Sequence, residues 1–247
     1  IMNGGQETEE GYDDDAYVLW NRYHDFYYAW DSIGENFFGL MVEKKEHSNV
    51  TVCYNDGIPN TDFNNDGSSD ILFKRSNGAY ATWYMNETGK IAAQGIMQDR
   101  GWTVHGIGDF NTDGHSDILF QRSDNSYLIW LMDETGKTGE IFVMQDRGFT
   151  VHGIGDFNKD GTSDILFKEP TGTYRVWFMS ATGKTGTLFV QDQAGWSVLG
   201  TGDFNKDGYT DIIFETPQKK IQIWHMNNKG KTGQILLMGD LGWKVLG

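Results

Sequence analysis

Hydrophobic and polar positions alternate along this chain in short runs. Between residues 102 and 145 the runs are WTVHGIG, DILFQR, YLIWLMD and EIFVMQ, rich in Val, Ile, Phe, Trp and Tyr, with Gly, Asn and Asp between them. A period of two in such residues is typical of half-buried strands. No helical stripe interrupts the pattern, so the chain is predicted to be all-β, with four strands in this segment.

The four-strand unit repeats. The segment DFNNDGSSDILF and its three variants begin at Asp62, Asp109, Asp156 and Asp203, a constant spacing of 47 residues. The turn before each fourth strand ends in Gly-Lys, as in NETGK from Asn86, with Gly where a turn needs a left-handed residue. Four antiparallel strands in this length form one blade of a β-propeller, whereas most other repeats of similar period are helical.

A fifth, degenerate blade precedes these four. VLWNRYHDFYYAW from Val18 aligns without a gap with ILFKRSNGAYATW from Ile71, at an offset of 53 residues. The final GWKVLG matches the first strand of a blade, which the N-terminal blade lacks. We therefore expect a five-bladed β-propeller spanning residues 15–247, its ring closed by the C-terminal strand pairing beside Val18–Arg22, after an acidic arm at residues 1–14. The alternative is an open stack that uses the same complementarity to polymerise.

Composition narrows the possible partners. The chain has 35 acidic and 20 basic residues and a formal charge of −15, which disfavours nucleic acid. No apolar run is long enough to predict membrane insertion, and IMNGGQETEE lacks the features of a signal peptide, so any such peptide is expected to have been removed already. The single cysteine, Cys53, lies in a predicted strand and is interpreted as a small buried hydrophobe.

Much of the negative charge lies in four nine-residue loops between the first and second strands. Counted from the first Asp, each loop has Asp, Asn and Asp at positions 1, 3 and 5, Gly at position 6 and Asp at position 9. Closely spaced hard oxygen donors with a Gly at the sharp turn are typical of a calcium loop. An EF-hand requires a bidentate Glu at position 12. All four loops have Phe there, for example Phe73, so an EF-hand is excluded.

Tandem strands joined by such loops and followed by DILF resemble the FG-GAP/VCBS repeat family of calcium-binding β-propellers, which are common in extracellular proteins. The resemblance implies about four structural Ca²⁺ ions and a secreted or cell-surface protein. It implies ligands at positions 1, 3, 5, 7 (main-chain carbonyl) and 9: Asp62, Asn64, Asp66, Ser68, Asp70; Asp109, Asn111, Asp113, His115, Asp117; Asp156, Asn158, Asp160, Thr162, Asp164; Asp203, Asn205, Asp207, Tyr209, Asp211.

Other recurring residues suggest packing more than chemistry. Tryptophans at one position of the third strand, such as Trp130, are interpreted as core between blades. The six histidines show no zinc spacing, and no nucleophile elbow, phosphate loop or HExxH occurs. We therefore predict no enzyme, with a polysaccharide-active enzyme as a minor alternative.

The predicted function is a lectin-like recognition module that binds a carbohydrate or cell-surface ligand, as in cell adhesion. The alternative is a self-associating subunit of an extracellular filament or surface layer. Ligand and calcium are expected on opposite faces, because blade connections and second-to-third-strand loops lie opposite the acidic loops. The predicted ligand residues combine charged groups with aromatic rings: Asp99, Arg100, Trp102, Arg122, Asp146, Arg147 and Phe149. The alternative is that the rings only cap the blade core.

Overall fold

A computed structural model describes residues 16–21, 26–31, 37–41, 51–52, 61–74, 77–97, 101–191 and 194–238. The chain divides into two units, residues 1–50 and 51–247, and each is described by itself. Within the described ranges the regular structure is β-strand throughout. These ranges include no helix long and apolar enough to cross a membrane.

The first unit contains a three-stranded antiparallel sheet in the order β1-β2-β3, with strands β1 (Ala16–Asn21), β2 (Phe26–Asp31) and β3 (Phe37–Met41). It lies where the degenerate first blade was predicted, which was expected to begin at its second strand. The register differs by one residue from the gapless alignment. Val18 pairs with Ala29, whereas the pairing of Ile71 with Trp83 in the next blade predicts Trp30.

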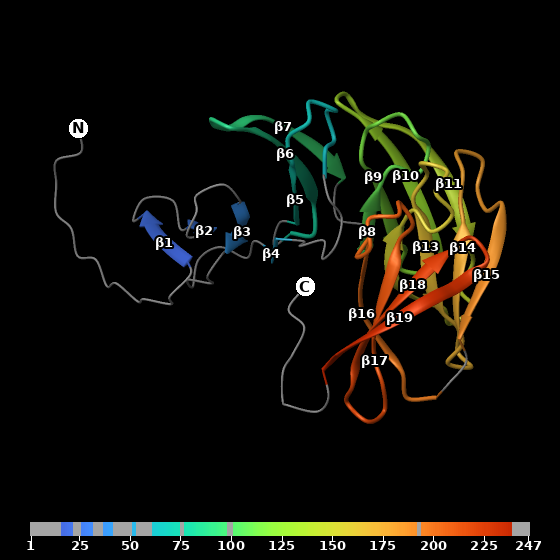
Figure 1. The fold of residues 1–247 in the computed structure, drawn as a ribbon. Coiled ribbons are helices and arrows are strands. Elements are labelled where there is room, and N and C mark those ends of the chain that lie inside the picture. Colours follow the sequence, from blue (N-terminus) through green and yellow to red (C-terminus); the bar gives the residue numbers. More distant parts are fainter. Residues whose placement is uncertain are drawn as a thin grey trace. The chain divides into compact units, whose positions relative to one another are not determined.

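The second unit contains four antiparallel sheets of four strands, in agreement with the predicted repeat (Figure 1). We call them blades 2 to 5. Their strands are β4 (Thr51–Val52), β5 (Ile71–Lys74), β6 (Tyr80–Asn86), β7 (Gly89–Met97); β8 (Thr103–Gly108), β9 (Asp117–Gln121), β10 (Tyr127–Asp133), β11 (Gly136–Met144); β12 (Thr150–Gly155), β13 (Asp164–Lys168), β14 (Tyr174–Phe178), β15 (Gly186–Gln191); β16 (Ser197–Gly202), β17 (Asp211–Glu215), β18 (Ile221–Asn227), β19 (Gly230–Met238).

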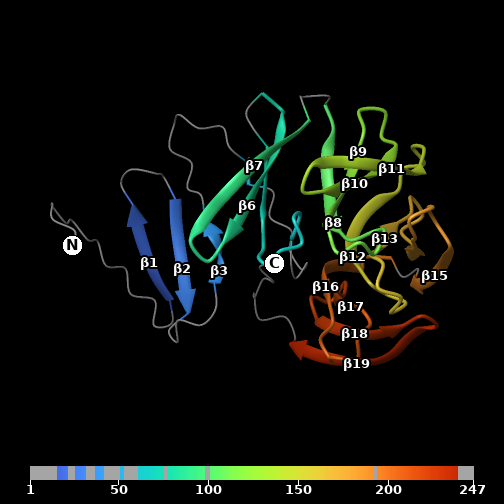
Figure 2. The same cartoon turned by 90° about the horizontal axis from the view of Figure 1, so that it is seen from above.

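The first strands of blades 3, 4 and 5 are neighbours, since β12 contacts both β8 and β16 (Figure 2). Glycines allow this approach. A Cβ atom added at Gly106 would lie 2.4 Å from Ile154 of the next blade, and one added at Gly153 would lie 2.4 Å from Thr201. The repeated His-Gly-Ile-Gly and Leu-Gly-Thr-Gly runs therefore match the packing of one inner strand on the next.

Aromatic rings from both sides fill each boundary between blades. Between blades 3 and 4, Tyr127 packs on Phe167 with 5.6 Å between ring centres, and Phe149, just before the first strand of blade 4, packs on the same ring at 6.0 Å. The Tyr127 hydroxyl donates to the carbonyl oxygen of Phe149 over 3.1 Å. Equivalent bonds join Tyr80 to Trp102 and Tyr174 to Trp196, so one repeated tyrosine links each blade to the connection that follows it.

The recurring third-strand tryptophans are buried in blades 3 to 5 and half-buried in blade 2, as expected for core residues. Each also carries a lysine from the Gly-Lys turn over its ring. The ammonium group of Lys184 lies 3.8 Å from the centre of the Trp177 ring, and the other pairs span 3.9 to 4.4 Å. The turn lysine thus covers one face of each tryptophan ring, a contact that gives these repeated positions a packing role.

The last blade exposes positions that the preceding blades bury. Phe204 is 44% exposed, whereas Phe157, its equivalent in blade 4, is fully buried. On the outer strand, Ile235 is 47% exposed and its equivalent Leu188 only 9%. In blades 3 and 4 the following blade covers these positions. The corresponding side of blade 5 is an apolar face that no described residue covers.

Candidate functional site

The four acidic loops of blades 2 to 5 share one backbone conformation. The Gly at position 6, predicted to form the sharp turn, has a φ of +86° in every loop. Position 4 is also left-handed although it is not Gly: Asn65 has a φ of 55°, and Thr112, Lys159 and Lys206 lie between 60° and 62°. Apart from Asn65, a residue type that tolerates this conformation, nothing in the sequence indicated a second left-handed residue.

The carboxylates at positions 1 and 5 accept hydrogen bonds from main-chain amides of their own loop and so hold its shape. In the first loop, Asp62 accepts the amides of Asp66 and Gly67 over 3.1 and 2.7 Å. Asp66 in turn accepts the amide of Ser68 over 2.8 Å and the side-chain amide of Asn64 over 2.9 Å. Equivalent bonds recur in the other three loops. The predicted donors therefore lie in loops that are already shaped.

The position-9 aspartate has a different role, because it is buried and joins the loop to the third strand. Asp117 is fully buried, and its carboxylate accepts the amides of Phe110 and Met132, each over 2.8 Å. Asp70, Asp164 and Asp211 make the same pair of bonds in their own blades. Each of these bonds leaves further lone pairs on the carboxylate oxygens, which can accept from or bind another group.

Burial makes the charged form of these aspartates costly. It raises the pKa of Asp70 to about 6, that of Asp117 to about 7 and that of Asp164 to about 8, with the neighbouring loop aspartates adding to the rise. Among the described residues, Asp211 is the one loop aspartate with an ion-pair partner, His225, at 2.9 Å. The ammonium group of Lys159 donates to the main-chain carbonyl of Asp207 and favours the charged form of its side chain, whereas the other described loop carboxylates form no ion pair with a lysine or arginine.

The acidic loops suit calcium in the chemistry of their oxygen donors and in the shape of their backbone. Carboxylate, amide and carbonyl oxygens at alternate positions are ligands that calcium prefers. In the described ranges, however, no three Asp, Glu, His or Cys side chains converge as a metal site, because the carboxylates point at main-chain amides. The predicted ligand residues are thus placed in four matching loops, while their convergence on an ion stays a prediction.

Successive loops are hydrogen-bonded to one another. The amide of Ser116, at position 8, donates to the carbonyl oxygen of Asp62, at position 1 of the preceding loop, over 2.7 Å. Ser163 and Thr210 make the same bond to Asp109 and Asp156, at 2.7 and 2.9 Å. The loops therefore form a continuous row along one side of blades 2 to 5, a connection that the spacing of the repeats did not reveal.

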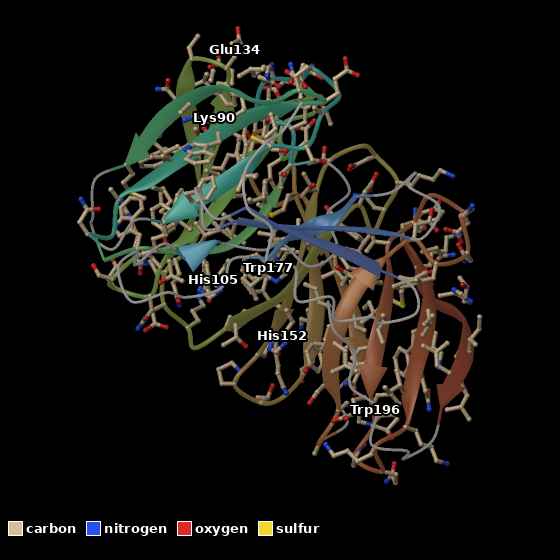
Figure 3. All side chains as sticks on the ribbon, turned by 90° about the vertical axis from the view of Figure 1, so that its left-hand side faces the viewer. Lys90, His105, Glu134, His152, Trp177 and Trp196 are labelled. Atoms are coloured by element: carbon tan, nitrogen blue, oxygen red, sulfur yellow. The ribbon has the colours of Figure 1, made fainter. Side chains whose placement is uncertain are left out.

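The two predicted faces are supported by contacts. On the side of the acidic loops, His115 lies 3.7 Å from Glu134, which projects from the β10–β11 turn (Figure 3). On the other side, the second-to-third-strand loop meets the blade connection, because the side-chain amide of Asn125 donates to Asp146 over 3.1 Å. Asp146, one of the residues predicted for ligand binding, therefore lies beside the second-to-third-strand loop and away from the acidic loops.

The predicted ligand residues do not all come together. Asp99 and Arg100 lie outside the described residues. Trp102 is only 8% exposed, and its ring packs against Phe120 and Trp130 with 5.9 and 5.7 Å between ring centres. Trp102 therefore caps the blade core and offers no surface for a ligand, because neighbouring rings enclose it.

Phe149 is likewise largely occupied by packing on Trp177 and Phe167, with 5.9 and 6.0 Å between ring centres. The Arg147 side chain is exposed but does not line the pocket described below. The aromatic positions just after the blade connections thus belong to the core, although the charged groups beside them suggested a binding role.

Two predicted residues, Arg122 and Asp146, do come together. They line an open pocket of about 320 Å³ on blade 3, with Asp124, Ser126, Phe142 and Gln145. The residues predicted from the sequence did not include Asp124 or Phe142. The sequence pattern could have identified Phe142, because it is a large apolar residue at a solvent-facing position of an outer strand, where the alternation of apolar and polar residues predicts a polar one.

The histidines at equivalent repeat positions, His105 and His152, lie at the bulges of β8 and β12 (Figure 3). Their rings pack edge-on against Tyr127 and Tyr174, at 5.5 and 5.3 Å between ring centres. Burial lowers the pKa of both. They are packing residues of the inner strands, in keeping with the absence of zinc spacing in the sequence.

Tandem four-stranded blades, each with a matching acidic loop between its first and second strands, define a repeat protein of β-propeller type. Two family models agree with this architecture: the FG-GAP-like repeat matches residues 62–120 and 109–167, and the FG-GAP repeat matches residues 194–238. The chain belongs to the FG-GAP repeat family, whose propeller domains are typically non-catalytic binding modules. The predicted resemblance to FG-GAP repeats is thereby confirmed, while calcium binding stays a prediction.

Other comparisons show only distant likeness. No curated protein matches the chain. Among solved structures, it is similar to KlHsv2 with loop 6CD replaced by a Gly-Ser linker, at 10% identity and a TM-score of 0.46, covering 94% of this chain and 67% of that one. It is also similar to the WD40 domain of SCAP from fission yeast, at 10% identity and a TM-score of 0.36, covering 94% of this chain and 58% of that one.

Proposed function

We propose that this chain is a calcium-loaded, secreted propeller that acts as a non-catalytic recognition module of lectin type. One observation carries the calcium part of the proposal: four loops of one conformation each bury an aspartate whose charge lacks a lysine or arginine partner among the described residues. A divalent cation would balance that charge. The donors would be the twenty residues at loop positions 1, 3, 5, 7 and 9 given above.

Calcium bound in these loops would be structural. Its charge would offset the repulsion among three carboxylates in each loop, and four ions would bring the formal charge from −15 to about −7. Because the position-9 aspartate also holds the third strand, a cation there would stabilise the whole blade. The row of hydrogen bonds between loops would connect this effect from one blade to the next.

Recognition would take place on the opposite face. The open pocket beside Arg122 and Asp146 presents hydrogen-bonding groups and an exposed ring, the mixture that carbohydrate hydroxyl groups and C–H faces require. The strongly acidic composition disfavours nucleic acid as the partner. A carbohydrate or cell-surface ligand therefore fits the chemistry of this face best.

A glycan array probed with and without calcium tests the function. We expect binding in calcium and weaker binding after chelation, because the pocket depends on blades that the loops stabilise. Elemental analysis of protein never exposed to chelator should find about four calcium ions per chain. Absence of binding to every glycan in the presence of calcium would refute the lectin function.

An exposed apolar face on blade 5 supports a second proposal, which concerns what covers that face. The uncovered apolar face of blade 5, formed by Phe204, Ile235 and Leu237, requires a partner. We propose that the first blade and the C-terminal strand cover it, which would close a five-bladed ring. The alternative is that a second copy covers it, which would make the chain a self-assembling subunit of a filament or surface layer.

A further inference from the structure

Blade 3 carries a combination of side chains that the other described blades lack. Arg122, Asp124 and Phe142 lie at repeat positions that hold Glu169, Thr171 and Phe189 in blade 4. In blade 5 the same positions hold a threonine, a glutamine and a leucine. The open pocket of about 320 Å³ is formed where these three residues meet Gln145 and Asp146.

The acceptors of this pocket are held in place before any ligand arrives. One oxygen of Asp124 accepts the amide and the hydroxyl of Ser126 over 3.0 and 2.6 Å. These bonds lower the pKa of Asp124, so it remains ionised and accepts hydrogen bonds only. Asp146 accepts the amide of Gly148 over 2.9 Å and the side-chain amide of Asn125 over 3.1 Å.

The donor of the pocket is the Arg122 guanidinium, which lies 5.2 Å from the centre of the Trp102 ring. This contact holds the guanidinium over the ring, and within the described part of the chain the guanidinium forms no hydrogen bond or ion pair. Its N–H groups are therefore available to a ligand. Stacking on a buried ring also limits the side-chain entropy lost on binding.

Phe142 supplies an apolar surface beside these groups. Its side chain is 56% exposed on the outer strand β11, directly opposite the buried Leu128 in the sheet register. A flat ring next to fixed acceptors and a free donor matches a sugar ring, whose C–H face stacks on the aromatic ring while its hydroxyl groups donate and accept.

Charge selects the class of sugar. Two carboxylates face one guanidinium, so an anionic ligand such as a sialylated, sulfated or phosphorylated glycan would meet net repulsion. A cationic ligand would leave the guanidinium unsatisfied. We infer that this pocket of blade 3 is a binding site for a neutral saccharide with adjacent hydroxyl groups, which donate to Asp124 and Asp146 and accept from Arg122.

This inference rests on the proposed lectin function, and the experiment separates the two. The probe is an array of neutral, sulfated and sialylated oligosaccharides in calcium buffer, followed by titration of the best neutral glycan. Phe142→Ala is expected to weaken binding about tenfold, because it removes the stacking surface. Arg122→Ala should weaken it similarly.

The matched control is Phe189→Ala, which removes an equally placed ring that is 49% exposed on the outer strand of blade 4. It should leave glycan binding unchanged. Melting curves confirm that each variant is folded. If the parent binds glycans and both Phe142→Ala and Arg122→Ala bind as tightly, the site assignment is wrong while the lectin function stands. Preference for acidic glycans would overturn the ligand class, and a parent that binds no glycan would overturn the function itself.

Discussion

Asp117 and Met132 are joined by a hydrogen bond of 2.8 Å from the main-chain amide of the methionine to the carboxylate. The bond ties the end of an acidic loop to the third strand of the same blade, and the other three loops repeat it. Whatever neutralises this buried carboxylate therefore acts on the packing of the blade as well as on the loop. If the loops bind a metal ion as proposed, this relationship would connect that binding to the stability of the fold.

Removal of calcium is the first expected perturbation. A ligand that binds only the folded state stabilises it by about 4 kcal/mol when its free concentration is 1,000 times Kd. Addition of EDTA should therefore lower the melting temperature clearly in differential scanning calorimetry, and excess calcium should restore it. Elemental analysis that finds less than one calcium per chain would contradict the proposal.

The second prediction concerns the metal-free protein and pH. The pKa of Asp164 is raised to about 8 and that of Asp117 to about 7, from about 3.9 in an unfolded chain. The folded state thus binds protons that the unfolded state releases, so stability is lost as the pH rises through these values. Between pH 6.5 and 8.5 we expect a loss on the order of 2 kcal/mol.

The pH window is chosen because the buried histidines have the opposite effect. Burial lowers the pKa of His105 and His152, so below about pH 6.5 their protonation favours the unfolded state. Chemical denaturation of resin-treated, metal-free protein at pH 6.5 and 8.5 measures the difference. Asp164→Asn should flatten the dependence, whereas Asp124→Asn, at an exposed site on the other face, should not. A stability that rises with pH in this window would refute the assignment.

The third prediction tests what covers the last blade. Ile235 and Leu236 are neighbours on β19 and are 47% and 56% exposed, yet they face opposite ways. The equivalents of Ile235 are buried in blades 3 and 4, whereas those of Leu236 are exposed. If the ring closes, Ile235→Asn should lower the stability by about 2 to 4 kcal/mol through burial of a polar group. Leu236→Asn should change it little.

Sedimentation measurements distinguish a ring closed within one chain from an assembly of several chains. In a closed monomer, Ile235→Asn lowers the melting temperature at every protein concentration. In an assembling protein, the same substitution dissociates large species and has its effect mainly at high concentration. A variant that matches the parent in both stability and mass would show that this face is not covered at all.

The strands and their order were predictable because alternation and a 47-residue spacing reflect local preferences that each blade repeats. The acidic loops were predictable for the same reason. The roles of single aromatic residues were not. Trp102 and Phe142 are both large rings near the ligand face, and only the packing shows that the first is enclosed by Phe120 and Trp130 while the second faces solvent. Periodicity identifies a face of a strand, whereas enclosure depends on the neighbouring blade.

The last prediction concerns the contact between inner strands. A Cβ atom at Gly153 would lie 2.4 Å from the Cγ2 atom and 3.1 Å from the Oγ1 atom of Thr201 in the next blade. Gly153→Ala should therefore force the two strands apart and destabilise the protein by about 1 to 3 kcal/mol, the usual cost of overpacking. Because Thr201→Ser removes the nearer atom, the double variant should recover part of the loss. Gly95→Ala, on an outer strand where the added atom meets nothing within 4 Å, serves as the control and should not destabilise. Denaturant unfolding of the parent, the two single variants and the double variant measures the coupling, and losses that simply add in the double variant would show that the close approach of Gly153 to Thr201 does not limit the packing of the blades.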